Sequence, residues 1–486
     1  MSKVADLAII NATLVSETLT GEASVAVRDG RIVAIGAAGD MPPAARTIDA
    51  SGLHLMPGVI DVHVHFREPG MDHKEDWESG SHAAAMGGVT TVFEMPNTDP
   101  PVNSVENYYL KKSFADAKSV VDYGLYGVLS DDSLDQLEPM AEAGIIGFKL
   151  FLGNTTGNLP CPSDGAILEA FEILGRMGKR CSIHAENSPI LFWREDRLKT
   201  AGRDDAMAHL LARTDVCALE ALSKSCILAE WTGARIHIVH ESSSLSLPYI
   251  DFYKSRGVDV TVETLPQYLY LSVDDMKRPG GEVLRMNPPI REAYHQKPLF
   301  DALANGPIDM LATDHAPHTA AEKSGNRIWD VACGFPGLES SLALMMTAVN
   351  EGRFDLKRYV QISSAAPARA WGLYGRKGVI APGADADMVL VDMNRTERLS
   401  AAGLASKGKA TPYEGRKVKG WPVATFVRGR QVMGDGEILA PPGWGEEVSQ
   451  SMPKPKPRNV DKHLATLCGA SPARASQAFL DDVRSP

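Results

Sequence analysis

Cysteine is scarce in this sequence, and long apolar runs are absent. The six cysteines among 486 residues are too few for a disulfide framework and lack the paired spacing of a zinc site, so we predict reduced thiols. No apolar run is long enough to span a bilayer. The first ten residues, M-S-K-V-A-D-L-A-I-I, lack the apolar core and cleavage site of a signal peptide. We therefore expect a cytoplasmic protein without a membrane partner.

An excess of positive charge is also missing. Lysine and arginine number 50 against 61 aspartates and glutamates, which gives a net charge of −11. Such a surface does not attract nucleic acid or an anionic membrane, so the expected partner is a small-molecule substrate. An anionic substrate must then be bound by local positive charge. Hydrophobic residues make up 44% of the chain, as in ordinary globular proteins, and the length suffices for a large domain and a smaller one.

Short β-strands are predicted at both ends of the chain. Residues 4–56 read as strands with turns, Asp29-Gly30 is a hairpin signal, and the pattern returns in A-T-F-V-R-G-R-Q-V-M-G-D-G-E-I-L. We predict that residues 1–56 and 376–440 pair into one small β-sandwich domain. Residues 441–486 are expected to form a C-terminal extension, since M-P-K-P-K-P-R is typical of a linker or a loosely docked tail.

Between these ends, apolar strand candidates alternate with helical stretches such as D-G-A-I-L-E-A-F-E-I-L-G-R-M-G. The strand candidates are 59–66, 89–96, 121–129, 144–152, 180–187, 235–242, 258–265 and 308–316. Eight such repeats predict an α/β fold, a (β/α)8 TIM barrel over residues 57–375. In this fold active sites form at the C-terminal ends of the strands.

Metal-type ligands lie near the ends of five of these strands. His63 and His65 are two positions apart on one strand, so their side chains project to the same face and can bind one ion. Further along the chain come Lys149, His184, His240 and Asp314. Together these six residues predict a hydrolase with two divalent metal ions, zinc being the expected element.

Lys149 and Asp314 have the most specific expected roles. Lys149 lies among Phe148, Leu150 and Phe151, where an unpaired ammonium is costly to bury. It either extends its amino group to the strand end or is carboxylated by CO2 and bridges two metals; the surrounding ligands favour the second interpretation. Asp314 suits a metal ligand that is also the general base.

Three other histidines are interpreted as structural. His54 precedes the barrel, and His82 falls in an amphipathic helical stretch. His237 has the opposite strand parity to His240, so we expect it to face a helix.

Several motifs together resemble one enzyme family. D-V-H-V-H-F-R-E-P-G at 61–70, M-P-N-T at 95–98, A-T-D-H-A-P-H at 312–318 and G-F-P-G-L-E at 334–339 resemble the cyclic-amide branch of the amidohydrolase superfamily, most closely the dihydroorotases. T-P-Y-E-G-R-K-V-K-G at 411–420 and P-P-G-W-G at 441–445 are similar to the same family. The resemblance extends from Leu7 to about Val448.

The resemblance implies a complete site. It places the metal ligands on the six residues above, with Lys149 N6-carboxylated, and the substrate-binding groups on Arg67, Asn97, His318, Thr155, Thr156 and Asn287. Arg67 offers a planar fork, Asn97 amide donors and His318 a further donor to a substrate carboxylate. Thr155 and Thr156 are expected at the tip of a mobile loop that closes over the substrate. We also expect a homo-oligomer, a dimer or tetramer.

The implied reaction is the reversible hydrolysis of (S)-dihydroorotate to N-carbamoyl-L-aspartate in pyrimidine biosynthesis. Asp314 is expected to take a proton from the attacking water and to return it to the departing amide nitrogen. Two departures from the dihydroorotase pattern leave the identity of the substrate ring undecided. Pro266-Gln267-Tyr268 replaces a Pro-His-His sequence and resembles hydantoinases, as does Asn287-Pro288-Pro289-Ile290-Arg291. A hydantoinase, dihydropyrimidinase or allantoinase is therefore the alternative enzyme, and Arg67 is the discriminating residue. An inactive scaffold is the non-enzymatic alternative, but no expected ligand is missing.

Overall fold

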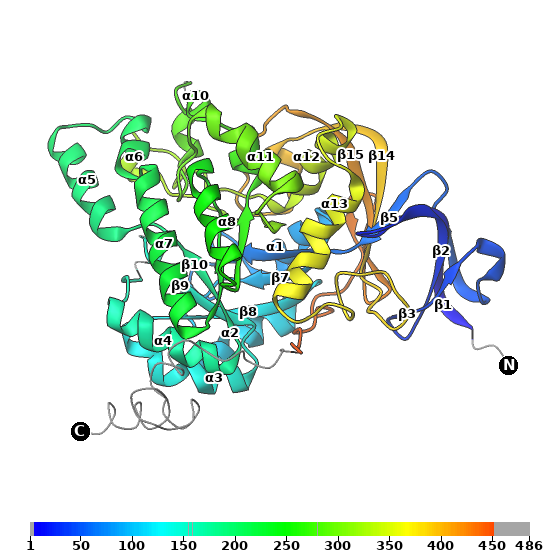
Figure 1. Ribbon diagram of the computed structural model, residues 1–486. Helices are drawn as coiled ribbons and strands as arrows, with labels where there is room; N and C mark the ends of the chain where they lie inside the picture. The colour runs from blue at the N-terminus through cyan, green and yellow to red at the C-terminus, as the bar shows by residue number, and fades with distance from the viewer. Residues whose placement is uncertain (1–3, 154, 158, 279, 452–486) are drawn as a thin grey trace, which may run out of the picture.

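The computed structural model describes residues 4–153, 155–157, 159–278 and 280–451. Figure 1 shows a large barrel and, beside it, a smaller β-domain that contains the N-terminal strands. No helix in these residues is both long enough and apolar enough to cross a membrane. The five cysteines among them are free; Cys468 lies outside the described residues.

Eight parallel strands form the barrel in the order of the sequence. They are β6 (Val59–Val64), β7 (Val89–Glu94), β8 (Asp122–Val128), β9 (Gly147–Phe151), β10 (Arg180–His184), β11 (Arg235–Ile238), β12 (Val260–Thr264) and β13 (Met310–Leu311). The last strand meets the first through a bridge between Val64 and His315, and the His65 N–H donates to the His315 carbonyl at 2.8 Å. The predicted (β/α)8 barrel is confirmed.

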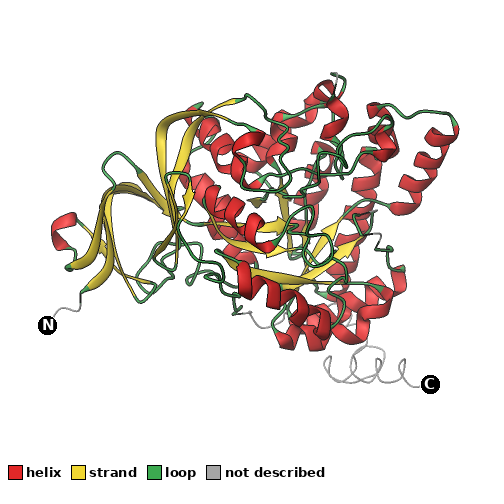
Figure 2. Ribbon diagram, turned by 180° about the vertical axis from the view of Figure 1, so that it is seen from behind, coloured by secondary structure: helices red, strands yellow, loops and turns green. Residues whose placement is uncertain are grey.

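Helices cover the outside of the barrel, as Figure 2 shows. They are α1 (Trp77–Met86), α2 (Val105–Lys118), α3 (Leu137–Ala143), α4 (Asp164–Met177), α5 (Ser188–Thr200), α6 (Ala206–Ala212), α7 (Asp215–Thr232), α8 (Leu247–Ser255), α9 (Pro266–Tyr270), α10 (Val273–Met276), α11 (Gln296–Asn305), α12 (Leu338–Asn350), α13 (Leu356–Val360) and α14 (Ala366–Ala370). Asp76, Ser104 and Ser163 cap α1, α2 and α4 by accepting backbone N–H groups of the first turn. Phe171 and Leu174 of α4 pack in one buried cluster with Ile183 of β10.

Both ends of the chain share one nine-stranded sheet. It contains β1 (Ala5–Val15), β2 (Thr20–Arg28), β3 (Arg31–Gly36), β4 (Ala44–Asp49), β5 (His54–Pro57), β14 (Met388–Arg398), β15 (Lys417–Val427), β16 (Arg430–Gly434) and β17 (Glu437–Ile438). Strand β5 joins the two halves, because it pairs with β1 on one side and with β14 on the other. The hairpin predicted at Asp29-Gly30 connects β2 and β3, and both residues have the positive φ that this turn requires.

A buried ion cluster holds the barrel against this sheet. Lys377 Nζ lies 2.6 Å from Asp122 on β8, 3.2 Å from Asp385 and 2.5 Å from Asp387, and the last two directly precede β14. These carboxylates are close enough together to hold a metal ion, but the Lys377 ammonium lies among them, and Arg376 and Arg428 pair with two of the three. The cluster is therefore a structural junction.

The start of the C-terminal extension docks on the barrel. The Tyr123 N–H donates to the Glu446 carbonyl, and the Val448 N–H donates to the Tyr123 carbonyl at 2.8 Å. Gln450 Nε2 donates to the Ile146 carbonyl. The tail predicted beyond Ser451 lies outside the described residues.

Several barrel strands end earlier than the sequence predicts. Strand β11 ends at Ile238, and β13 contains two residues. The functional positions that follow strands leave the extended conformation, with φ values of +65° at Arg67, +42° at His240 and +45° at Asp314. Positive φ is unfavourable for side chains with a Cβ, so tertiary contacts hold these residues in place. The alternation of side-chain direction along a strand therefore does not predict where these three side chains point.

Candidate metal centre and substrate cavity

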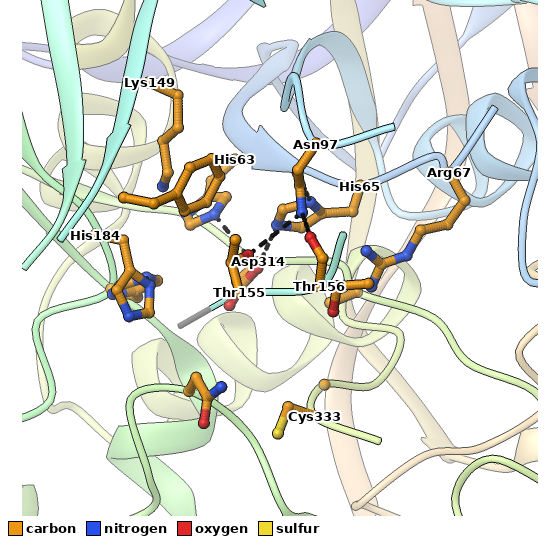
Figure 3. Close-up of a pocket in the computed structure, with 15 residues that line it drawn as sticks. His63, His65, Arg67, Asn97, Lys149, Thr155, Thr156, His184, Asp314 and Cys333 are labelled. Carbon is orange, nitrogen blue, oxygen red and sulfur yellow. Dashed lines mark hydrogen bonds and ion pairs between the residues drawn. The ribbon is translucent and has the colours of Figure 1, made fainter. Parts of the chain in front are cut away.

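A cavity opens at the C-terminal ends of the barrel strands. All six predicted metal ligands line it: His63, His65, Lys149, His184, His240 and Asp314. Arg67, Asn97, Thr155, Thr156 and Asn287 line it as well, as Figure 3 shows for most of them. The structure thus brings together residues that are up to 251 positions apart, the separation of His63 and Asp314 in the numbering.

His63, His65 and Asp314 form one ligand group. The Oδ1 atom of Asp314 lies 3.3 Å from His63 Nε2 and 3.1 Å from His65 Nε2. All three residues are buried, and their ligand atoms lie within 4.8 Å of one another, a spacing that suits a metal ion. Burial lowers the pKa of His65 to about 4, so its ring is neutral and able to bind a metal.

His184 and His240 form the second group. His184 Nδ1 faces His240 Nε2 at 2.8 Å, and both residues are buried. Burial lowers the pKa of His240 well below its usual value, with His184 and Lys149 contributing in the same direction. One of these nitrogens donates to the other, and the two neutral imidazoles together supply a second pair of ring nitrogens for a metal.

Lys149 lines the cavity together with both histidine groups. It is 1% exposed, its Nζ lies 5.2 Å from the centre of the Phe151 ring, and no hydrogen bond or ion pair joins it to another described side chain. Burial lowers the pKa of His63, His184 and His240, and the positive charge of Lys149 acts in the same direction. Burial lowers the pKa of Lys149 itself to about 8, which makes the neutral amine accessible. A buried ammonium beside four histidines that can bind metal is unfavourable unless its charge is removed or balanced by an anion.

Hydrogen-bond acceptors behind the histidines determine which ring nitrogen of each carries the proton and which is left to bind a metal. Glu263 Oε1 lies 2.6 Å from His63 Nδ1, and Glu186 Oε2 lies 2.8 Å from His184 Nε2. A carboxylate only accepts, so these nitrogens carry protons and leave Nε2 of His63 and Nδ1 of His184 as metal-binding atoms. Asn97 Oδ1, 3.0 Å from His65 Nδ1, has the same effect on His65.

Sequence reasoning missed both of these glutamates. Burial raises the pKa of Glu186, but Arg213 and His184 together hold it at about 2. Burial raises the pKa of Glu263, but Lys149 and the His240 N–H oppose this shift and favour the carboxylate. The available signal was position, since Glu186 follows His184 by two residues and Glu263 precedes the end of β12 by one.

The predicted carboxylate-binding residues separate into two that line the cavity and one that does not. Arg67 is 2% exposed and donates through Nε to the Pro317 carbonyl at 3.3 Å. Burial lowers its pKa only to about 10, so the guanidinium stays charged. Asn97 lines the cavity, with its Nδ2 donating to the Thr156 carbonyl.

His318 lies behind Arg67. Its Nε2 is 3.3 Å from an Arg67 amino group and 3.0 Å from the Cys333 carbonyl, and Lys74 Nζ contacts its Nδ1. Because the carbonyl only accepts, Nε2 carries the proton and Nδ1 accepts from Lys74. In this arrangement His318 packs against Arg67 from outside the cavity and is not among the residues that line it.

Thr155 and Thr156, the predicted tip of a loop that closes over the substrate, line the cavity, and the closing motion stays a prediction. Asn97 Nδ2 lies 3.4 Å from Thr155 Oγ1 and 3.0 Å from the Thr156 carbonyl, so these residues after β9 contact the M-P-N-T motif that follows β7. Cys333 and Gly334 add a wall that the sequence reasoning did not identify as part of the site. Their nearest signal was the adjacent G-F-P-G-L-E motif, which starts at Gly334.

The prediction for His237 was wrong. It pairs in register with Ser182, whose hydroxyl bonds Tyr126 inside the barrel, and its Nε2 lies 2.9 Å from Glu263 Oε2. His237 therefore faces the barrel interior. The parity argument failed because β11 ends at Ile238 and His240 has positive φ. His54 on β5 and His82 on α1 do not line the cavity.

Comparisons with known proteins agree with this site. The sequence matches the amidohydrolase family over residues 54–432. An L-hydantoinase from Paenarthrobacter aurescens is 35% identical over 452 residues, which cover 92% of this chain and 98% of that protein. A dihydroorotase from Halobacterium salinarum is 38% identical over 397 residues, covering 81% and 89%. The solved structure of an L-hydantoinase (dihydropyrimidinase) from Arthrobacter aurescens has a TM-score of 0.90 at 34% identity, covering 92% of this chain and all of that one.

The barrel, the candidate metal ligands and these matches define a hydrolase of cyclic amides with a candidate metal centre. The chain belongs to the amidohydrolase family, in its cyclic-amidohydrolase branch.

Proposed function

We propose that this protein is a dihydroorotase that converts (S)-dihydroorotate and N-carbamoyl-L-aspartate into each other in pyrimidine biosynthesis. The observation that carries the proposal is Arg67, a buried and charged guanidinium on the cavity wall. Arg67 and Lys149 are the two cationic side chains among the described residues that line the cavity. A planar guanidinium matches a carboxylate, and dihydroorotate carries one on its ring.

The metal part of the proposal is a pair of divalent ions, zinc being the expected element, with Lys149 N6-carboxylated. The donor set supports this, because two groups of neutral imidazoles lie near a buried lysine, and the buried Asp314 Oδ1 accepts no hydrogen bond from a described residue. Carboxylation converts the uncompensated cation into an anionic ligand. When bound, divalent ions polarise the ring carbonyl and lower the pKa of water.

The chain's own residues carry out the remaining chemistry. Arg67 and Asn97 hold the carboxylate and orient the ring toward the histidines. Asp314 takes the proton of the attacking water and then gives it to the ring nitrogen as the amide bond breaks. Its positive φ directs the carboxylate toward His63 and His65, where this transfer takes place.

A hydantoinase, dihydropyrimidinase or allantoinase remains the second candidate, supported by the coverage of the L-hydantoinase match. Of the hydantoinase-like residues after β12, Asn287 lines the cavity, whereas Gln267 and Tyr268 support this candidate less. Gln267 Nε2 donates to the Thr313 carbonyl at 2.7 Å and the Tyr268 hydroxyl donates to the Pro288 carbonyl at 2.8 Å, and neither residue is among those that line the cavity. Both residues hydrogen-bond to loops beside the site, so we do not expect them to contact the substrate ring.

The direct test is a substrate panel with the purified protein. We expect hydrolysis of dihydroorotate and, in the reverse direction, cyclisation of N-carbamoyl-aspartate, with slower turnover of dihydrouracil, hydantoin and allantoin. Preferred turnover of one of the last three would replace dihydroorotase by the second candidate. The proposal also includes a cytoplasmic location and assembly into a dimer or tetramer, which sedimentation measures.

A further inference from the structure

A chain of polar side chains runs inside the barrel from the candidate metal centre toward the base. Glu263 joins His63 Nδ1 at 2.6 Å to His237 Nε2 at 2.9 Å, using a different carboxylate oxygen for each. On the far side, His237 Nδ1 lies 2.9 Å from Thr261 Oγ1. Arg180, the first residue of β10, reaches the same hydroxyl at 3.3 Å. Four strands, β6, β10, β11 and β12, contribute to this chain.

The direction of each hydrogen bond follows from the donor chemistry. A guanidinium only donates, so Arg180 donates to Thr261, and the Thr261 hydroxyl can donate to His237 Nδ1. His237 Nε2 then carries the ring proton and donates to Glu263. Glu263 also accepts the His240 N–H at 3.0 Å, on the oxygen that faces His63. Every hydrogen in the chain points toward Glu263, which favours its carboxylate form.

Burial keeps water away from these groups. His63, His237, Glu263 and Arg180 are at most 2% exposed. The His237 ring packs against Trp371 with its centre 5.1 Å away. Without His237, one oxygen of a buried carboxylate loses its donor, and Glu263 is free to turn away from His63.

We infer that His237 is a positioning residue that acts through Glu263, holding His63 in the tautomer and orientation that bind metal. The inference rests on the metal centre proposed above but not on the identity of the ring. It assigns a role to the pair Glu263–His237 that extends beyond the six metal ligands.

The test compares three variants with the wild-type protein. His237→Phe keeps a ring against Trp371 but removes both hydrogen bonds, whereas His237→Gln retains an amide donor that reaches toward Glu263. His295→Phe is the matched control, because His295 is 1% exposed and hydrogen-bonds to Ser244 without contacting any candidate ligand. Each protein is loaded with Zn²⁺ and titrated with a chelator while retained metal is counted, and its Co²⁺-loaded form is examined by absorption spectroscopy.

We expect His237→Phe to retain one of its two ions about 10- to 100-fold less tightly, because the carboxylate that orients His63 loses its donor and such a carboxylate usually contributes this much to metal affinity. Its Co²⁺ spectrum should shift, and His237→Gln should recover most of both properties. His295→Phe should match the wild type. Wild-type retention and spectrum in His237→Phe, or an equal loss in His295→Phe, would overturn the inference.

Thr261→Val covers the case in which His237→Phe fails to fold. It leaves His237 in place but removes the hydroxyl at its Nδ1, so a smaller loss of metal in the same direction is expected, and unchanged retention counts against the inference. A wild-type protein that binds no metal overturns the metal centre and this inference together. A protein that binds two ions but ignores dihydroorotate overturns only the proposed substrate.

Discussion

His65 Nε2 lies 3.1 Å from Asp314 Oδ1, although the two residues follow the first and the last strands of the barrel. The same junction carries the His65 N–H bond to the His315 carbonyl. Closure of the barrel and assembly of the first ligand group are therefore the same event. A change that loosens the seam between β6 and β13 is expected to weaken the site before it unfolds the domain.

Lys149→Ala should lose most bound metal and most activity. The buried lysine becomes an anionic ligand near both histidine groups when it is carboxylated, and alanine supplies no ligand. Metal content by mass spectrometry and turnover measure the effect, and added short-chain carboxylic acids should restore part of the activity. Lys179→Ala is a suitable control, since Lys179 bonds the Ile145 carbonyl and Gln450 away from the cavity. Full metal content in Lys149→Ala would rule out a bridging role.

Asp314→Asn should keep much of its metal but lose about 10²- to 10⁴-fold in turnover, the usual contribution of a positioned acid–base group. The amide matches the carboxylate in shape and still offers one oxygen to His63 and His65, but it cannot accept the water proton. Steady-state kinetics at matched metal content provide the measurement. Turnover close to the wild-type rate would remove Asp314 from proton transfer.

Lys377→Met should destabilise the fold without changing the metal centre. It leaves Asp122, Asp385 and Asp387 buried without their shared cation, and breaking a buried ion pair in this way costs about 3–5 kcal/mol. Denaturant unfolding gives the free energy of unfolding, and chelator titration of the folded protein gives metal retention. A variant as stable as the wild type would show that the cluster does not hold the two domains together.

The sequence predicts the barrel and most of the site because both depend on local signals. Strand-ending residues such as His63, Lys149 and His184 are visible as polar positions in apolar runs, and the barrel topology brings such positions to one mouth. Glu263 and Glu186 gave no comparable signal, since an acidic residue near a strand end is usually a surface group. Only the three-dimensional pairing with His63 and His184 shows their role.

His237 and His318 show why side-chain direction was harder to predict than element type. The parity rule assumes a strand that continues to His240, but the strand ends at Ile238 and His240 adopts positive φ. His318 belongs to the matching motif, yet its ring is occupied by the Cys333 carbonyl and Lys74. Both outcomes are set by contacts distant in sequence, which no local pattern contains.

The measurement that tests the central claim most directly compares dihydroorotate with dihydrouracil, the same ring without the carboxylate, in the wild type and in Arg67→Ala and Arg67→Lys. A charge-assisted arginine–carboxylate contact contributes about 1.5–3 kcal/mol, and about 1.4 kcal/mol corresponds to a factor of ten. We therefore expect Arg67→Ala to lose at least about tenfold in kcat/KM for dihydroorotate and little for dihydrouracil. Arg67→Lys should recover little, because a point charge lacks the planar fork. Efficient turnover of dihydrouracil by the wild type, with dihydroorotate ignored and Arg67→Ala unchanged, would contradict the account.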